Sequence, residues 1–70
     1  MSKNELDFAV FCIENVAEFL GKNGADVYKM LDESRILDDY IISSYDVLHT
    51  LSKEYVVTDT TDYMKEKGLI

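Results

Sequence analysis

Hydrophobic residues dominate the segment from Leu6 to Leu20, where eleven of fifteen positions are apolar. At about 100° per residue, one helical face collects Leu6, Ala9, Val10, Ile13, Val16, Ala17 and Leu20, with Cys12 beside them and Phe8 and Phe19 at the flanks. An acidic stripe on the opposite side consists of Asp7, Glu14 and Glu18. A helix this apolar is expected at the centre of the fold, with neighbours on more than one side.

Capping residues mark where this helix begins and ends. Ser2 and Glu5 have the spacing of a capping box, and Gly21 suits a helix C-terminus. A second, shorter helix is predicted from residue 25 to about 33, with Val27, Met30 and Leu31 on its apolar side.

Residues 36–51 keep the three- and four-residue spacing of a helix, but two serines interrupt the pattern. Ser43 and Ser44 suggest a fresh N-cap, so we expect helices over about 36–42 and 44–51; a single kinked helix is the alternative. Residues 55–58 have strand propensity, yet the period of apolar positions from Lys53 to Gly68 favours a helix.

The pattern therefore predicts an all-α fold, a compact bundle of four or five short helices packed on the N-terminal helix. We expect one domain over residues 1–70. A chain of this length buries only about 60% of its unfolded surface. One cysteine excludes an internal disulfide, so association with itself as a homodimer or with another protein is the expected supplement; good helix packing alone is the alternative.

Charge narrows the classes of partner. Fourteen acidic against seven basic residues give a net charge of −7, which repels nucleic-acid phosphates and anionic membranes and suits solubility or a basic partner. The longest apolar run, six residues from Phe8 to Ile13, is too short for a membrane span. The first residues lack the features of a signal peptide, so we expect a cytoplasmic protein with a reduced thiol.

No arrangement of residues names a reaction. Cys12 and His49 are the only possible nucleophile and base, but Cys12 lies on the core side of its helix, which favours a structural role. Asp38, Asp39 and Asp46 lack the spacing of a calcium loop, and no glycine-rich phosphate loop is present. We therefore expect no enzymatic activity, no cofactor and no metal.

Two sets of residues are candidates for protein binding. The first is Phe11, which shares the acidic stripe of Asp7, Glu14 and Glu18; it is either a binding anchor or a core residue under the C-terminal segment. The second set is Tyr45, Asp46 and His49, which one helical turn brings together. These three form either a local hydrogen-bonded set, with Asp46 reaching His49, or a contact surface.

The segment from Tyr45 to Thr50 resembles a signature of short bacterial proteins that form a domain family of unknown function. Further carriers of the resemblance are Phe11–Asn15, Val27-Tyr28, Glu54–Val57 and Asp62-Tyr63, so it covers nearly the whole chain. Its members often have glycine near positions 35 and 52, where this chain has Arg35 and Ser52. The resemblance implies a gene beside an ADP-ribosyltransferase-like protein, and so a toxin–antitoxin or operon-partner role. It implies no catalytic residues.

Protein binding, in the form of antitoxin-like neutralisation of a neighbouring toxin, is the expected function. A small DNA-binding regulator is a second hypothesis, but the segment from Ile36 to Leu51 has three aspartates and no lysine or arginine for a recognition helix. A self-associating structural domain and a small enzyme are further alternatives. Loss of any activity in both Cys12→Ala and His49→Ala would indicate the enzyme.

Overall fold

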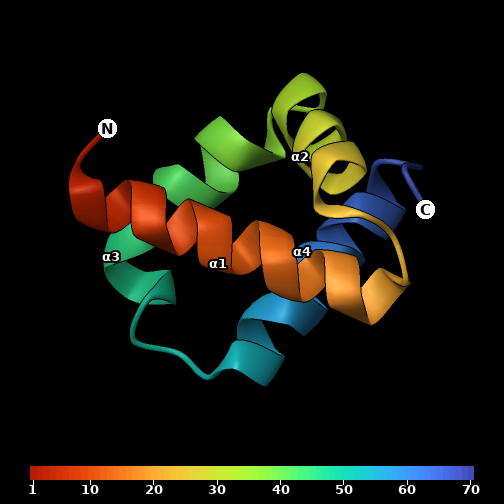
Figure 1. Cartoon of the computed structure of the whole chain (residues 1–70). Coiled ribbons are helices and arrows are strands. Elements are labelled where there is room, and N and C mark those ends of the chain that lie inside the picture. Colours follow the sequence, from red (N-terminus) through yellow and green to blue (C-terminus); the bar gives the residue numbers. More distant parts are fainter.

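A computed structural model describes all residues from Met1 to Ile70 as five helical segments joined by short turns. The N-terminal helix α1 (Lys3–Leu20) lies across the molecule in Figure 1, with α2 (Gly24–Glu33) and η1 (Leu37–Ile42) above it. The short helix α3 (Tyr45–Leu48) lies below its first half, and α4 (Lys53–Glu66) lies below and behind its second half. The all-α fold and the central position of the N-terminal helix are therefore confirmed.

Local sequence signals set most of the helix ends. Ser2 and Glu5 form the reciprocal hydrogen bonds of a capping box, and Gly21 adopts the left-handed conformation that ends α1. The Asn23 side chain accepts a hydrogen bond from the Asp26 amide and caps α2. The Ser52 hydroxyl accepts a hydrogen bond from the Tyr55 amide and caps α4. Residues 55–58 lie within this helix, so the predicted helix is confirmed and a strand is excluded there.

The region around the two serines is divided, as predicted, although its geometry differs. Residues 37–42 form a π-helix, whose wider hydrogen bonds span five residues rather than four. Ser44 precedes α3, but neither serine side chain caps that helix, so the predicted serine cap is wrong. Arg35 is the one residue other than glycine with a positive φ, at 71°.

The core lies between α1, α2, η1 and α4. Its eleven buried members are Ala9, Cys12, Val16, Ala17, Val27, Leu31, Ile36, Leu37, Ile41, Val56 and Met64. The predicted apolar side of α2 is confirmed, because Val27 and Leu31 are buried and Met30 packs against the core. On α1 the prediction is partly wrong, because Leu6 and Val10 are 52% and 43% exposed while Cys12 is fully buried. The buried side of the first half of α1 is thus turned toward Cys12 and Phe8.

Polar contacts fasten α4 to the rest of the bundle. The Tyr40 hydroxyl donates a hydrogen bond to the Asp59 carboxylate, and the Tyr40 ring meets Tyr63 edge to face at 5.5 Å. Burial, and then this hydrogen bond, raise the pKa of Tyr40. Lys67 Nζ donates to the Ser34 carbonyl at 3.0 Å and lies over the Tyr63 ring. These contacts hold α4 against η1 and the end of α2, and its first turns lie beside the end of α1.

Candidate protein-binding face

Four rings lie in a continuous series on the surface where α1 meets α3. Phe11 stacks on Phe8 at 6.1 Å between ring centroids, and Phe8 meets Tyr45 edge to face at 5.5 Å. Tyr45 then stacks on His49 at 4.5 Å. We call Phe11, Phe8, Tyr45 and His49 the aromatic row. It joins the two candidate sets that the sequence could only place on separate helices.

Exposure varies along the aromatic row. Phe8 and Tyr45 are half-buried in its middle, whereas Phe11 is 38% exposed and His49 is exposed at its ends. Phe11 is therefore neither a fully exposed anchor nor a residue buried under the C-terminal segment. Its ring rests on Phe8 and keeps part of its surface in water.

Hydrogen bonds in α3 are local and fix the orientation of its rings. His49 Nδ1 lies 2.7 Å from the Tyr45 carbonyl oxygen. Because a carbonyl oxygen only accepts, Nδ1 is the donor in this hydrogen bond. The Thr50 hydroxyl donates to the Val47 carbonyl at 2.7 Å. The expected contact from Asp46 to His49 is absent, because the ring instead bonds the backbone one turn earlier and stacks on Tyr45.

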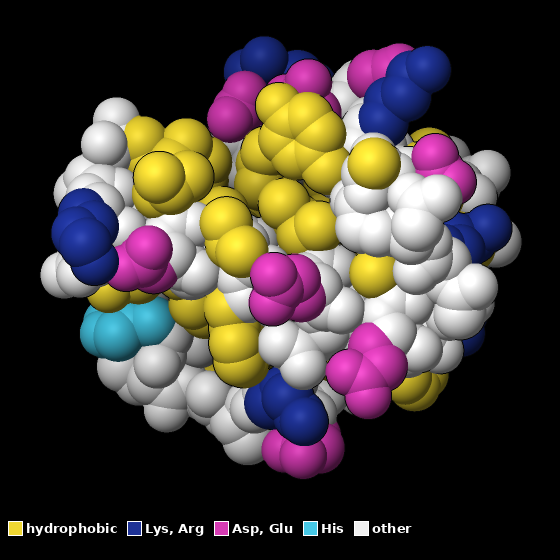
Figure 2. Space-filling model, in the orientation of Figure 1, with side chains coloured by type: hydrophobic (Ala, Val, Ile, Leu, Met, Phe, Trp, Pro, Cys, Tyr) yellow, Lys and Arg dark blue, Asp and Glu magenta, His cyan; other side chains and the backbone are white.

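Acidic side chains border the aromatic row. Asp7, Glu14, Glu18 and Asp46 are all exposed. Asp7 pairs with Lys3 at 2.9 Å, whereas Glu14, Glu18 and Asp46 have no cationic side chain within 4.0 Å. In Figure 2 hydrophobic side chains spread over the face that α1 presents, with acidic side chains among them and the single histidine near one edge. The result is an apolar surface whose border carries three uncompensated carboxylates and one that is paired.

Phe8 is the member of the face that sequence reasoning missed as a binding residue. The helical wheel placed it at a flank of the core side, and its spacing of three residues from Phe11 was the available signal. Only its contact with Tyr45, 37 positions later in the chain, connects the two helices.

The remaining candidate groups have structural surroundings. Cys12 is fully buried, and burial raises its pKa to about 12, so the thiol is protonated at neutral pH. Asp38 and Asp39 lie 3.4 and 3.6 Å from the Arg35 guanidinium. No cluster of three His, Cys, Asp or Glu side chains has the arrangement of a metal site. None of the helices is both long enough and apolar enough to cross a bilayer.

Residues 7–67 match the model of a family described as protein of unknown function (DUF3791), and the chain belongs to that family. No curated protein and no solved structure matches the chain. The matched range contains the whole aromatic row and its acidic border.

Proposed function

We propose that this chain is a protein-binding module, and that the aromatic row with its acidic border is the surface that meets the partner. The observation that carries the proposal is the continuous contact from Phe11 through Phe8 and Tyr45 to His49. Aromatic side chains supply most of the binding energy in many interfaces. Here each ring already rests on the next, so little side-chain entropy is lost when a partner covers them.

The border indicates the chemistry of the partner. Glu14, Glu18 and Asp46 are negative charges without ion-pair partners, on a protein with a net charge of −7. A basic cleft with an apolar floor is complementary to this surface. Carboxylates at such a rim raise the association rate, while the rings that lose their water slow dissociation.

The family resemblance suggests a particular partner, an ADP-ribosyltransferase-like enzyme encoded by a neighbouring gene. We propose that the chain neutralises such an enzyme in the manner of an antitoxin, by covering a basic surface that the enzyme needs. The test is co-expression of the tagged chain with the neighbouring gene product, followed by co-purification and by growth of cells that produce both proteins.

Two truncations at the exposed ends of the row give the sharpest comparison. Phe11→Ala and His49→Ala are each expected to weaken the complex, with Phe11→Ala costing about 2 kcal/mol, which is roughly 30-fold in Kd. Val47→Ala is the matched control, because Val47 is 62% exposed and lies on the side of α3 away from the row. Equal affinities for the Phe11→Ala, His49→Ala and Val47→Ala proteins would refute this binding surface.

The border is tested by charge. Asp7→Asn combined with Glu14→Gln is expected to lower the association rate and leave the dissociation rate nearly unchanged, with an effect that fades at high salt. Stopped-flow association at two ionic strengths measures it. An unchanged association rate at low salt would contradict electrostatic guidance by these carboxylates.

A further inference from the structure

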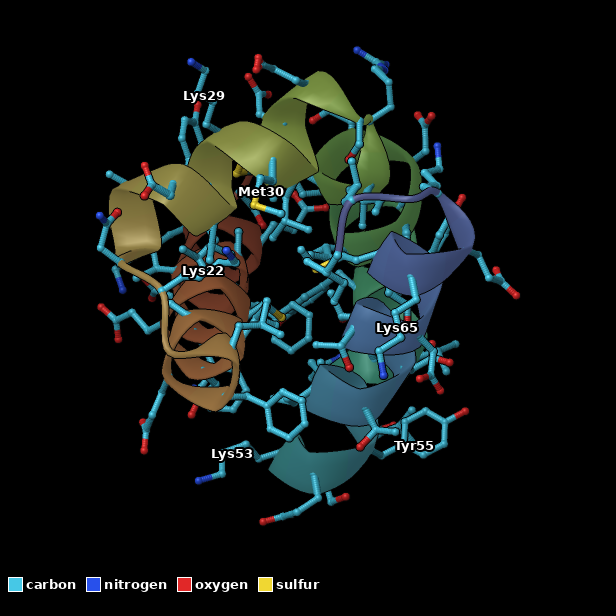
Figure 3. All side chains as sticks on the ribbon, turned by 90° about the vertical axis from the view of Figure 1, so that its right-hand side faces the viewer. Lys22, Lys29, Met30, Lys53, Tyr55 and Lys65 are labelled. Carbon is cyan, nitrogen blue, oxygen red and sulfur yellow. The ribbon has the colours of Figure 1, made fainter.

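A second surface feature lies where the last turns of α1 run beside the first turns of α4. Here an open groove of about 280 Å³ is lined by Asn15, Glu18 and Phe19 from α1 and by Lys53, Glu54, Val57 and Thr58 from α4. Figure 3 looks onto this side of the molecule, with Lys53 at the start of α4 and Tyr55 directed away from α1. Within α1, the Asn15 side chain donates a hydrogen bond to the Phe11 carbonyl at 2.8 Å, so this lining residue lies one helical turn from the end of the aromatic row.

The groove combines an aromatic surface with hydrogen-bond acceptors. Phe19 is 63% exposed, more than Phe11 or Tyr55, and Val57 is the other hydrophobic residue of the lining. Glu18 and Glu54 bring one carboxylate from each helix, and neither is within 4.0 Å of a cation. The Asn15 amide donates one of its two N–H groups to the backbone, and its carbonyl oxygen stays available as an acceptor.

We propose that this groove binds an arginine side chain of the partner, with the guanidinium stacked on Phe19 and hydrogen-bonded to Glu18 and Glu54. The identity of the partner rests on the proposed function, whereas the arginine preference rests on the groove alone. A planar guanidinium stacks on aromatic rings and offers five donors, so it matches both properties of the lining. A lysine would provide a charge without the planar stack, and an aliphatic side chain would desolvate the carboxylates without satisfying them.

Lys53 provides a test in which removing a positive charge from the groove should increase the affinity for arginine ligands. Its ammonium is the one positive charge in the lining and opposes an incoming guanidinium. Lys53→Gln is therefore expected to tighten binding of arginine ligands about threefold or more, whereas most truncations of a binding site weaken it. Lys22→Gln makes the same charge change outside the lining and is the matched control.

The experiment uses the full chain and a phage-displayed library of random dodecapeptides. Selected peptides are sequenced, and the most enriched are synthesised and titrated by calorimetry. Arginine is expected to be enriched over the input library, and its replacement by lysine in a selected peptide is expected to weaken binding about fivefold or more. Peptide binding is expected to weaken at least tenfold in Phe19→Ala and in the double variant Glu18→Gln, Glu54→Gln. Glu33→Gln is the control, because Glu33 is exposed and lies outside the groove lining.

The outcomes separate the two proposals. The groove proposal is supported if peptide binding depends on arginine, is abolished by Phe19→Ala and is unchanged by Phe11→Ala. This holds even if the chain and the neighbouring gene product do not co-purify. The groove proposal would be overturned if arginine is not enriched, or if the lysine peptide binds as tightly as the arginine peptide. It would also be overturned if the Lys53→Gln protein binds the arginine peptide more weakly than the Lys22→Gln protein does. None of these results would affect the aromatic row as a surface for the partner.

Discussion

Thr60 places a polar atom in the core without a partner, which makes it a point where the protein can be stabilised. Its side chain is fully buried in the middle of α4, and Oγ1 has no hydrogen-bond partner in the protein. A buried hydroxyl without a hydrogen bond costs about 1–3 kcal/mol. Valine has nearly the same shape and a similar helix propensity, so Thr60→Val removes this cost and changes little else.

We expect Thr60→Val to raise the free energy of unfolding by about 1–2 kcal/mol. For a domain of this size, each kcal/mol raises Tm by about 4–8 °C, which thermal denaturation followed by circular dichroism resolves easily. The control is Thr61→Val on the same helix, because the Thr61 hydroxyl donates to the Thr58 carbonyl at 3.0 Å. That change should be neutral or cost up to about 1 kcal/mol. If Thr60→Val is no more stable than Thr61→Val, the Thr60 hydroxyl is satisfied and the reasoning fails.

Three further predictions address Cys12, the exposure of α1 and the turn at Arg35. Burial raises the pKa of Cys12 from its ordinary value of 9.0 to about 12, so its contribution to stability is complete below pH 9 and is lost as pH rises toward 12. The free energy of unfolding should therefore fall less steeply between pH 9 and pH 12 in Cys12→Ala than in the wild-type protein. Thiol reagents should label the wild-type protein slowly until denaturant is added. Ile13→Ala should lower the free energy of unfolding by about 2–4 kcal/mol because Ile13 packs against the core, whereas Phe11→Ala should lower it by less than about 1.5 kcal/mol. Denaturant titrations measure both losses, and equal losses would place Phe11 in the core. Arg35 has a φ of 71°, so Arg35→Gly should be about 1 kcal/mol more stable than Arg35→Ala, and the reverse order would exclude strain at this turn.

Much of the fold follows from local signals in the sequence. Ser2, Gly21 and Ser52 end or begin helices because their side chains or backbone freedom act within three or four residues. The helical period of 53–66 outweighed the strand propensity of residues 55–58, because Val56, Val57 and Met64 could share one buried face only in a helix. The π-helix at 37–42 left no comparable signal, since its pattern of apolar residues is close to that of an α-helix.

The sequence predicted the two parts of the candidate surface but not that they meet. Phe11 and its acidic neighbours could be assigned to one side of a helix, and Tyr45 to the same turn as His49, because both statements depend on residues less than two turns apart. That the two sets meet through Phe8 depends on where α3 docks, which no local pattern encodes.

What the sequence determined by itself is the set of helices and the approximate direction of each apolar face, because these depend on backbone geometry and nearest neighbours. The tertiary structure decided which part of each face is covered. Leu6 and Val10 lie on the apolar side of α1 yet stay exposed, because α3 packs beside Phe8 and turns the buried side that way. The groove at Phe19 arises likewise, from the way the end of α1 and the start of α4 lie side by side. Such contacts join residues tens of positions apart, and their choice is made by the packing of the whole bundle.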